Sequence, residues 1–344
     1  MDVDVATDIL SRLPVRSLLR FKCVSKLWMT LISDPYFKMK HLNNTRNDEN
    51  SQKILVNQCY SYTDKVSLYC YSLSSIQQVE QVQKLDCPSN NKSLRHTLYC
   101  CCDGLVLMGI FDYPDKYLQL LLLNPSTRES ILLPFPKILP KDNCTWGLGY
   151  DSTSDDYKIL KIDDKSHSEI LALKSGSWRL TNKHPIDVRP MLTSTDSLAF
   201  VHGAFHWLIS SLTKYYVMSF SISDEVYGDI PLPEKMYSNF SKFCGRGVSI
   251  LGGMLCAYSH CVSDWKDMFK FWVMKDYVNA SWTELFTIRG LDLQSAIPKY
   301  MFPDGKVLLS CRNLFGCSYV FMTSNGLFGL WPRSDVVQQG FVYT

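Results

Sequence analysis

The fold of this chain is decided by one stretch near its start, residues 7–42, which reads TDILSRLPVRSLLRFKCVSKLWMTLISDPYFKMKHL. Apolar side chains recur there at helical spacing and predict three short helices. Pro14 ends the first helix and opens the second, Ser25 is the predicted N-cap of the third, and Asp34-Pro35 is expected to stop it. A unit this small is near the lower limit for independent folding. It carries more apolar side chains than it can bury, which indicates an interface.

The composition of the whole chain is that of a globular protein. Of the 344 residues, 46% are hydrophobic and 20% are charged, which argues against disorder. There is no run of eighteen apolar residues, so no membrane span is expected, and Leu120–Leu123 is interpreted as a buried strand. The N-terminus lacks the basic, apolar and small-residue pattern of a secretion signal. We therefore expect a protein of the cytoplasm, the nucleus or both, with no membrane partner.

The net charge of +3 lies in the N-terminal stretch. Residues 1–42 contain seven Lys or Arg and four Asp or Glu, and the remainder carries equal numbers of both kinds. Seven Lys and Arg residues spread over three helices are too few and too scattered to indicate a nucleic-acid-binding patch. An acidic protein partner fits the charge about as well, and no nucleic-acid partner is predicted.

The cysteines, histidines and paired aspartates do not indicate a metal site or a catalytic site. Thirteen cysteines occur without a C-x-x-C pair, and Cys100–Cys102 are consecutive, so reduced thiols are favoured over zinc frameworks or disulfides. His202 and His206 would share one strand face, where packed or turn histidines are favoured over a metal pair. Asp155-Asp156 and Asp163-Asp164 are interpreted as turn residues and not as paired carboxylates. No catalytic residue, metal or cofactor is predicted.

From about residue 50 onward, short β-rich runs separated by turn residues favour a sandwich, a barrel or a propeller. Similar turns recur near positions 54, 104, 154, 203, 253 and 305, in steps of about fifty residues. A period near fifty is typical of kelch-type blades. The predicted fold class is α+β multidomain, with a three-helix module over 1–42, a linker over 43–52 and an all-β, six-bladed kelch-like propeller over 53–344.

Residues 9–37, ILSRLPVRSLLRFKCVSKLWMTLISDPYF, closely resemble the F-box motif in its plant form. The positions that fall in register are Leu13-Pro14, Ser17–Phe21, Cys23–Ser25 and Trp28. The resemblance implies docking onto the Skp-type adaptor of a cullin–RING ubiquitin ligase. Carried over position by position, it implies an adaptor-binding surface made of Ile9, Leu13, Pro14, Leu18, Leu19, Val24, Trp28 and Leu31. The alternative is that these side chains only pack an internal helical core.

The β-rich region resembles the plant F-box-associated domain. The likeness spans about residues 98–310 and is carried by NPSTRESILLP (124–134), LGYDSTSDDYKILKI (148–162), FVHGAFHWL (200–208) and FWVMKDYVNASWTELFTI (271–288). It implies a protein-binding domain and does not identify the substrate. Propellers present loops on one face, and aromatic residues in polar loops make good anchors for a partner. The candidate substrate-binding residues are Tyr113, Tyr117, Trp146, Tyr237, Phe240 and Trp265.

We therefore expect the substrate-recognition subunit of a Skp–cullin–F-box ubiquitin ligase, a subunit that is not itself an enzyme. The helices would fix it to the adaptor, and the β-domain would hold an unknown target protein near the ubiquitin-charged enzyme, so that proximity supplies the catalysis. Two alternatives stay open. One is a propeller enzyme with a helical arm. The other is an F-box scaffold acting outside the ligase. The family usually has a Leu-Pro or Ile-Pro pair before the first helix, and its absence here keeps this alternative open. Either the missing pair weakens adaptor binding or the start at Met1 is placed too late in the sequence.

Overall fold

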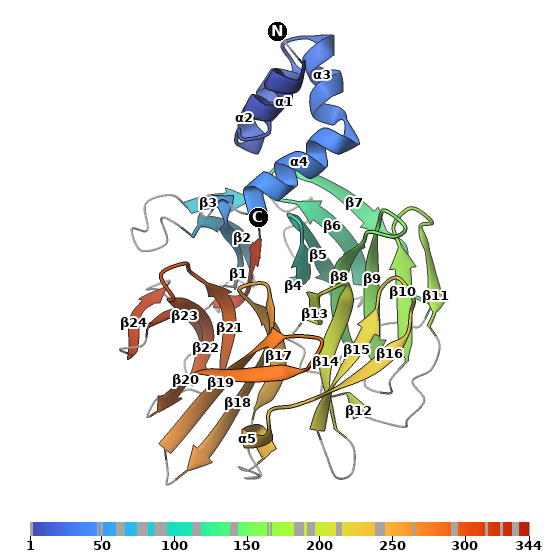
Figure 1. Cartoon of the computed structure of the whole chain (residues 1–344). Coiled ribbons are helices and arrows are strands. Elements are labelled where there is room, and N and C mark those ends of the chain that lie inside the picture. Colours follow the sequence, from blue (N-terminus) through green and yellow to red (C-terminus); the bar gives the residue numbers. More distant parts are fainter. Residues whose placement is uncertain are drawn as a thin grey trace.

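The structure is a computed structural model in which a helical module projects from one end of a β-propeller (Figure 1). The described residues are 3–46, 48, 51–59, 66–73, 82–85, 95–111, 118–137, 144–163, 165, 167–181, 189–190, 197–210, 215–237, 245–263, 266–289, 295–313, 316–323, 326–331 and 337–343. None of the helices in these ranges combines the length and the apolarity needed to cross a bilayer.

The N-terminal module contains four helices, and not the three that were predicted. They are α1 (Val3–Leu10), α2 (Val15–Lys22), α3 (Lys26–Ser33) and α4 (Pro35–Arg46). The backbone N–H groups of Tyr36 and Phe37 donate to the Asp34 carboxylate, at 2.8 and 3.4 Å, and Pro35 is the first helical residue. Asp34-Pro35 therefore ends α3, as predicted, and also caps and opens a further helix, α4. Because α4 continues to Arg46, the predicted linker over 43–52 begins inside a helix.

The helices share a small core and are joined by hydrogen bonds. Leu10, Leu18, Ile32 and Phe37 are the buried apolar residues of this core. Ser25 is the N-cap of α3, as predicted, and its hydroxyl accepts the backbone N–H of Trp28 at 3.2 Å. The position of each short helix is thus fixed by its neighbours as well as by its own backbone bonds.

Over the described residues, five hydrogen-bonded sheets form the propeller. Three have four strands in chain order: β4 (Arg95–Cys102), β5 (Leu105–Phe111), β6 (Leu118–Asn124) and β7 (Glu129–Leu133); β8 (Cys144–Asp151), β9 (Asp156–Asp163), β10 (Ser168–Ala172) and β11 (Ser177–Leu180); β17 (Arg246–Leu251), β18 (Met254–Ser263), β19 (Lys266–Asp276) and β20 (Ser281–Arg289). A fourth sheet contains β12 (Arg189–Pro190), β13 (Ala199–Val201), β14 (Ala204–Ser210), β15 (Tyr215–Ser221) and β16 (Tyr227–Pro231), and is followed by the short helix α5 (Glu234–Tyr237).

The fifth sheet corrects the predicted count of six blades. Its eight strands are β1 (Lys53–Cys59), β2 (Val66–Ser72), β3 (Val82–Leu85), β21 (Ser295–Met301), β22 (Val307–Asn313), β23 (Gly316–Thr323), β24 (Gly326–Trp331) and β25 (Val337–Tyr343). Two predicted repeats share this sheet because Cys317 of β23 pairs with Val337 of β25. β25 also runs antiparallel to β1, which joins the two ends of the propeller. The inner strands β25, β4, β8, β13, β17 and β21 contact one another in succession around the centre.

Two-residue turns explain the repeat seen in the sequence. Asp103-Gly104, His202-Gly203 and Gly252-Gly253 each join two paired strands, and all six residues have positive φ. Such turns match the twist of a hairpin and favour Gly, Asn or Asp. The anchors near 104, 203 and 253 are therefore hairpin turns at equivalent places in three of the sheets, whereas the anchor near 54 lies within β1 (Lys53–Cys59).

The hydrophobic core lies between neighbouring sheets. Strand alternation sends Ile159 of β9 toward the β4–β7 sheet and Leu160 toward the sheet of β12–β16. Tryptophans add polar ties across these boundaries. The indole N–H of Trp178 in β11 donates to the carbonyl oxygen of Pro134, after β7, at 2.8 Å, and that of Trp282 in β20 donates to Pro231, at the end of β16, also at 2.8 Å.

Candidate functional site

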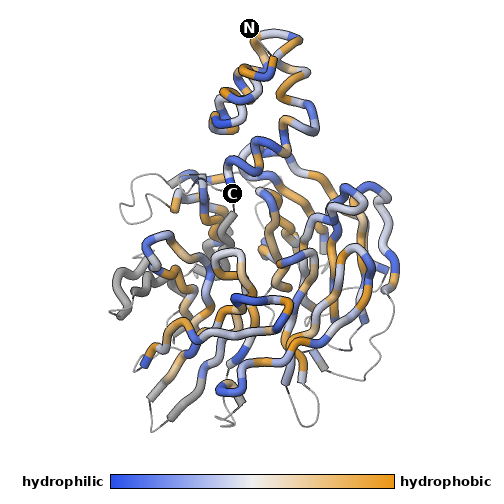
Figure 2. Tube along the Cα trace, viewed as in Figure 1, coloured by the Kyte–Doolittle hydropathy of each residue, from blue (hydrophilic) through white to orange (hydrophobic). Residues whose placement is uncertain are grey.

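Exposed apolar side chains gather on the N-terminal helices. The large exposed ones are Val3, Val5, Ile9, Val24, Leu27, Met29, Tyr36 and Met39. Figure 2 shows hydrophobic and hydrophilic segments intermixed on these helices, which project from one end of the propeller and contact it through Arg46 with Asp103 and Arg16 with Gln83. An apolar surface of this density on a unit of about forty residues marks a docking surface for another protein.

The predicted adaptor-binding residues divide into three groups. Ile9, Pro14 and Val24 are exposed, and the Val24 side chain reaches 66% exposure. The half-buried residues are Leu13, Leu19, Trp28 and Leu31. The Trp28 ring stands edge-on to Phe21, with centroids 5.0 Å apart, so it packs the module as well as facing outward.

One residue of the predicted surface is misplaced. Leu18 is only 5% exposed and packs against Leu10, Ile32 and Phe37 inside the module. It belongs to the inner face of α2, so it supports the surface from beneath instead of forming it. The sequence reasoning also omitted Leu27 and Met29, which are exposed beside the half-buried Trp28. Helical periodicity could have found Met29, which lies off the α3 face of Trp28, Leu31 and Ile32, but Leu27 is four residues before Leu31 and lies on the same side of the helix, so periodicity alone does not mark it as exposed.

Helix α4 holds the module against the propeller. On the side of the module, the Asn44 amide donates to the backbone oxygen and the hydroxyl of Ser11, at 3.2 and 3.0 Å, and the His41 ring donates to the Leu13 carbonyl at 2.9 Å. In the same last part of α4, the Arg46 guanidinium pairs with the Asp103 carboxylate of the propeller, with one Nε–Oδ1 distance of 3.1 Å. The propeller side of this contact is reinforced because the Tyr157 hydroxyl donates to Asp103 at 3.1 Å.

The predicted substrate-binding residues are mostly beyond what the structure describes. Tyr113, Tyr117, Phe240 and Trp265 lie outside the described residues, and Tyr237 is described only as the last residue of α5. Trp146 contradicts the prediction. It lies within β8, is 1% exposed, and packs between the rings of Tyr99 and Trp178, with centroid distances of 5.1 and 6.0 Å. It is a core residue between two sheets because the strand continues through a segment that had been taken for a loop.

The histidine pair has a structural role. His206 is fully buried, its Nδ1–H donates to the Ala199 carbonyl at 3.2 Å, and its Nε2 accepts the Tyr277 hydroxyl at 2.6 Å. His202 occupies a hairpin turn with a φ of 51°. The prediction of packed or turn histidines is confirmed for these two residues. Over the described part of the chain, no group of three His, Cys, Asp or Glu side chains is placed to hold a metal ion.

A small cavity lies at the centre of the ring. It measures about 240 Å³ and is bordered by the inner strands, with Cys101, Asp103 and Lys299 in its wall. Burial raises the pKa of Cys101 to about 12 and raises the pKa values of Cys100 and Cys102 well above the ordinary thiol value. These thiols are protonated at neutral pH and are poor nucleophiles.

Family comparisons agree with this architecture. The model of the F-box domain matches residues 1–40, and that of the F-box associated beta propeller domain matches residues 49–326. The chain belongs to the family of F-box proteins that carry an F-box associated β-propeller domain. An Arabidopsis thaliana F-box/kelch-repeat protein is 27% identical, over 96% of this chain and 92% of the relative. The F-box protein CPR1 of the same plant is also 27% identical, over 83% and 72%.

A solved structure from a study of two prolyl endopeptidases covers 84% of this chain and 44% of that chain. The TM-score is 0.43 and the sequence identity is 8%, so this likeness supports no statement about function.

Proposed function

We propose that this chain is the substrate-recognition subunit of a Skp–cullin–F-box ubiquitin ligase and recruits a target protein for ubiquitination. The observation that carries the proposal is the exposed apolar surface of an F-box module, which includes Val24, Leu27 and Met29. Such a surface is costly to leave in water, and an adaptor protein would cover it. The complex would act in the cytoplasm, the nucleus or both.

The proposed mechanism is positional. The adaptor would bind through Ile9, Pro14 and Val24 together with Leu13, Leu19, Trp28 and Leu31, and the propeller would bind the target. Helix α4 supports this division of labour, since its bonds to Ser11 and Asp103 tie the two parts together. A ligase subunit that holds a target close to the ubiquitin-charged enzyme raises the effective concentration of the reacting groups. It needs no reacting group of its own.

Co-expression of the full chain with a Skp-type adaptor and a cullin tests the proposal, with size exclusion to detect a complex. Val24→Asp places a charge on the proposed surface and is expected to weaken adaptor binding at least tenfold, as expected for a charge buried in an interface. Leu132→Asp is the matched control, because Leu132 is 65% exposed on β7 of the propeller. That variant is expected to bind the adaptor normally.

The outcomes separate the competing functions. Co-elution of chain, adaptor and cullin that is lost only in Val24→Asp supports the ligase function. Elution with the adaptor but never with the cullin would favour a scaffold acting outside the ligase. A folded chain that elutes apart from the adaptor would overturn the proposal.

A further inference from the structure

A second cavity, at the far end of the propeller from the helical module, has the features of a recognition pocket. It measures about 440 Å³ and lies where the end of β16 and helix α5 meet β19 and β20. Its lining residues are Pro231, Leu232, Pro233, Glu234, Lys235, Trp272, Ala280, Trp282 and Glu284. Figure 1 places α5 at the end of the propeller opposite α1–α3. A ligand bound here would leave the adaptor surface free.

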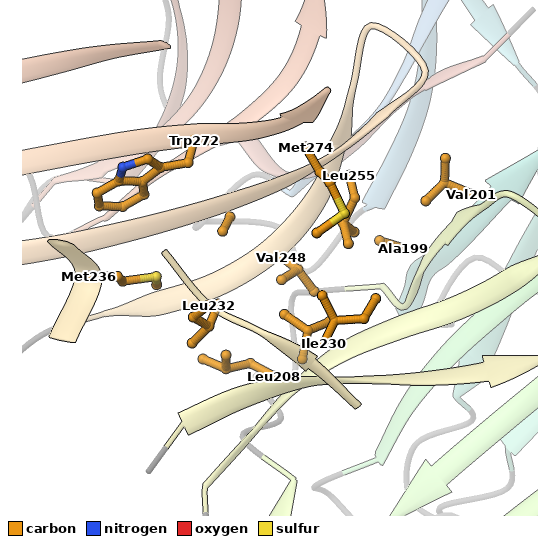
Figure 3. Close-up of a cluster of buried hydrophobic side chains, with 12 residues drawn as sticks. Ala199, Val201, Leu208, Ile230, Leu232, Met236, Val248, Leu255, Trp272 and Met274 are labelled. Atoms are coloured by element: carbon orange, nitrogen blue, oxygen red, sulfur yellow. The ribbon is translucent and has the colours of Figure 1, made fainter. Parts of the chain in front are cut away.

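The apolar floor of this pocket is fixed by the core beneath it. Figure 3 shows Trp272, Met236 and Leu232 at one end of a cluster of buried side chains that extends to Ala199 and Val201 at the other. Trp272 is almost fully buried. The Trp282 indole is held by its bond to the Pro231 carbonyl, at 2.8 Å, so its ring plane is set before any ligand arrives. Such pre-organisation lowers the entropic cost of binding.

The equivalent boundary between two other sheets is closed. Trp178 makes the same bond to Pro134, but it is 4% exposed and packs edge-on against Trp146. Trp282 is half-exposed and faces the cavity instead. The hydrogen bond from a tryptophan indole to a proline carbonyl can therefore join two sheets without an open pocket beside it, as it does at Trp178. The open ring at Trp282 is therefore available for contact with a partner.

The charges around the cavity favour a cation. Glu234 and Glu284 both line it, against one ammonium group from Lys235. Lys235 Nζ lies 3.8 Å from the Glu284 carboxylate, and its side chain is 77% exposed. An exposed ion pair of this kind contributes little free energy, so a cation that binds Glu284 more tightly than Lys235 does can displace it. The Thr287 hydroxyl donates to the Glu284 carboxylate at 3.0 Å and helps to orient it.

We propose that this pocket binds an arginine side chain of the target protein. The inference rests on the proposed role as a substrate receptor and names the chemistry of the substrate. A guanidinium group is planar and weakly hydrated, so it can stack on the Trp282 indole while its N–H groups pair with a carboxylate. Glu284 and Glu234 would supply the carboxylates, and Pro231 and Pro233 would contact the aliphatic stem.

The test measures binding of Nα-acetyl-arginine N-methylamide to the full chain by saturation-transfer NMR and titration. The matched probe is the citrulline derivative, which has nearly the same shape and no charge. We expect a dissociation constant on the order of 1 mM for the arginine probe, the scale of small fragments, and binding at least about tenfold weaker for citrulline. Glu284→Gln and Glu234→Gln should each weaken arginine binding by about threefold or more.

Glu129→Gln is the control variant. Glu129 is an exposed β7 carboxylate that accepts a threonine hydroxyl, as Glu284 does, and lies outside the pocket. It should leave arginine binding unchanged. Equal binding of arginine and citrulline, or arginine binding that is insensitive to both pocket variants, would overturn the proposal. A lysine derivative that binds as tightly as arginine would overturn the choice of guanidinium.

The same preparation distinguishes this inference from the proposed function. A chain that co-elutes with the adaptor but does not bind the arginine probe refutes the pocket alone. A chain that binds arginine but never co-elutes with the adaptor refutes the ligase function alone.

Discussion

The indole N–H of Trp178 and the carbonyl oxygen of Pro134 form a 2.8 Å hydrogen bond across the boundary between two sheets. Trp282 and Pro231 repeat this bond at another boundary. In each case the outer strand of one sheet is tied to the end of the outer strand of the sheet before it. The bond supplies a directional contact at boundaries that are otherwise held by apolar packing, and it fixes how far each sheet can splay from its neighbour.

Removing the Trp178 donor should destabilise the propeller. Trp178→Phe keeps an aromatic ring but removes a donor from a side chain that is 4% exposed, in a bond that is partly buried, and we expect a loss of about 1–3 kcal/mol in the free energy of unfolding. Urea denaturation of the full chain measures it. Trp282→Phe removes the same bond at a half-exposed site, where water can replace the donor, so its cost should be under about 1 kcal/mol. Equal costs for the two variants would contradict this account.

The Arg46–Asp103 pair should govern how firmly the helical module is held. Asp103→Asn removes the charge and keeps a residue that tolerates the positive φ of the turn, so the hairpin should survive. We expect protease cleavage between α4 and β1 to accelerate severalfold. Because the Asp103 side chain is only 8% exposed and also accepts the Tyr157 hydroxyl, the propeller should lose about 1–2 kcal/mol of stability. Asp304→Asn is the control, since Asp304 pairs with Lys306 within its own turn. Unchanged cleavage in Asp103→Asn would show that other contacts hold the module.

Stability should fall on mild acidification because of His206. Burial lowers the pKa of His206 to about 4, from 6.5 for the free side chain. The unfolded chain therefore takes up the proton first as the pH falls. The stabilisation is complete above pH 6.5 and is lost as the pH falls toward 4, to a total of about 3 kcal/mol.

Urea unfolding between pH 7 and pH 4.5 measures this dependence. His206→Gln should flatten it, although His96, whose pKa is also lowered by burial, contributes with the same sign. A variant with the full pH dependence of the parent chain would exclude His206 as its source.

The buried ion pair of Lys161 and Glu169 should behave as a unit. The Nζ–Oε2 distance is 2.9 Å, both side chains are buried, and Glu169 also accepts the backbone N–H of Lys137 at 2.9 Å. Lys161→Met alone leaves a buried carboxylate without its main partner and should cost about 3–5 kcal/mol. The double variant with Glu169→Gln should recover part of that loss. A double-mutant cycle measures the coupling, and additive losses would contradict it.

Local signals in the sequence predicted a large part of this fold. The Ser25 cap and the Asp103-Gly104 and Gly252-Gly253 turns depend on a few neighbouring residues, so they could be read directly. The blade count was wrong because it depends on a contact between distant segments. β25 pairs with β1 and β23 only in the folded chain, and no local sequence pattern predicts this pairing.

The functional surface was less predictable for the same reason. Leu18 and Val24 are both apolar residues on short helices, and only the packing of all four helices buries one and exposes the other. Asp34-Pro35 ends α3 as predicted, but the next helix, α4, was missed, because an Asp-Pro pair can both end one helix and cap another. The pocket at Trp282 could not be found from sequence at all, since it joins residues about fifty positions apart across two sheets.

The pairing of β25 with β1 sets an order of events during synthesis. The helices of residues 3–46 leave the ribosome before any part of the propeller, whereas β1 must wait for β25, which is made after every other strand. Domains generally fold as units while the chain emerges. A nascent or prematurely terminated chain would therefore present the exposed apolar residues of its helices while the ring of the propeller is still open. Under the proposed function, such a fragment would compete with the full chain for the adaptor without recruiting a target.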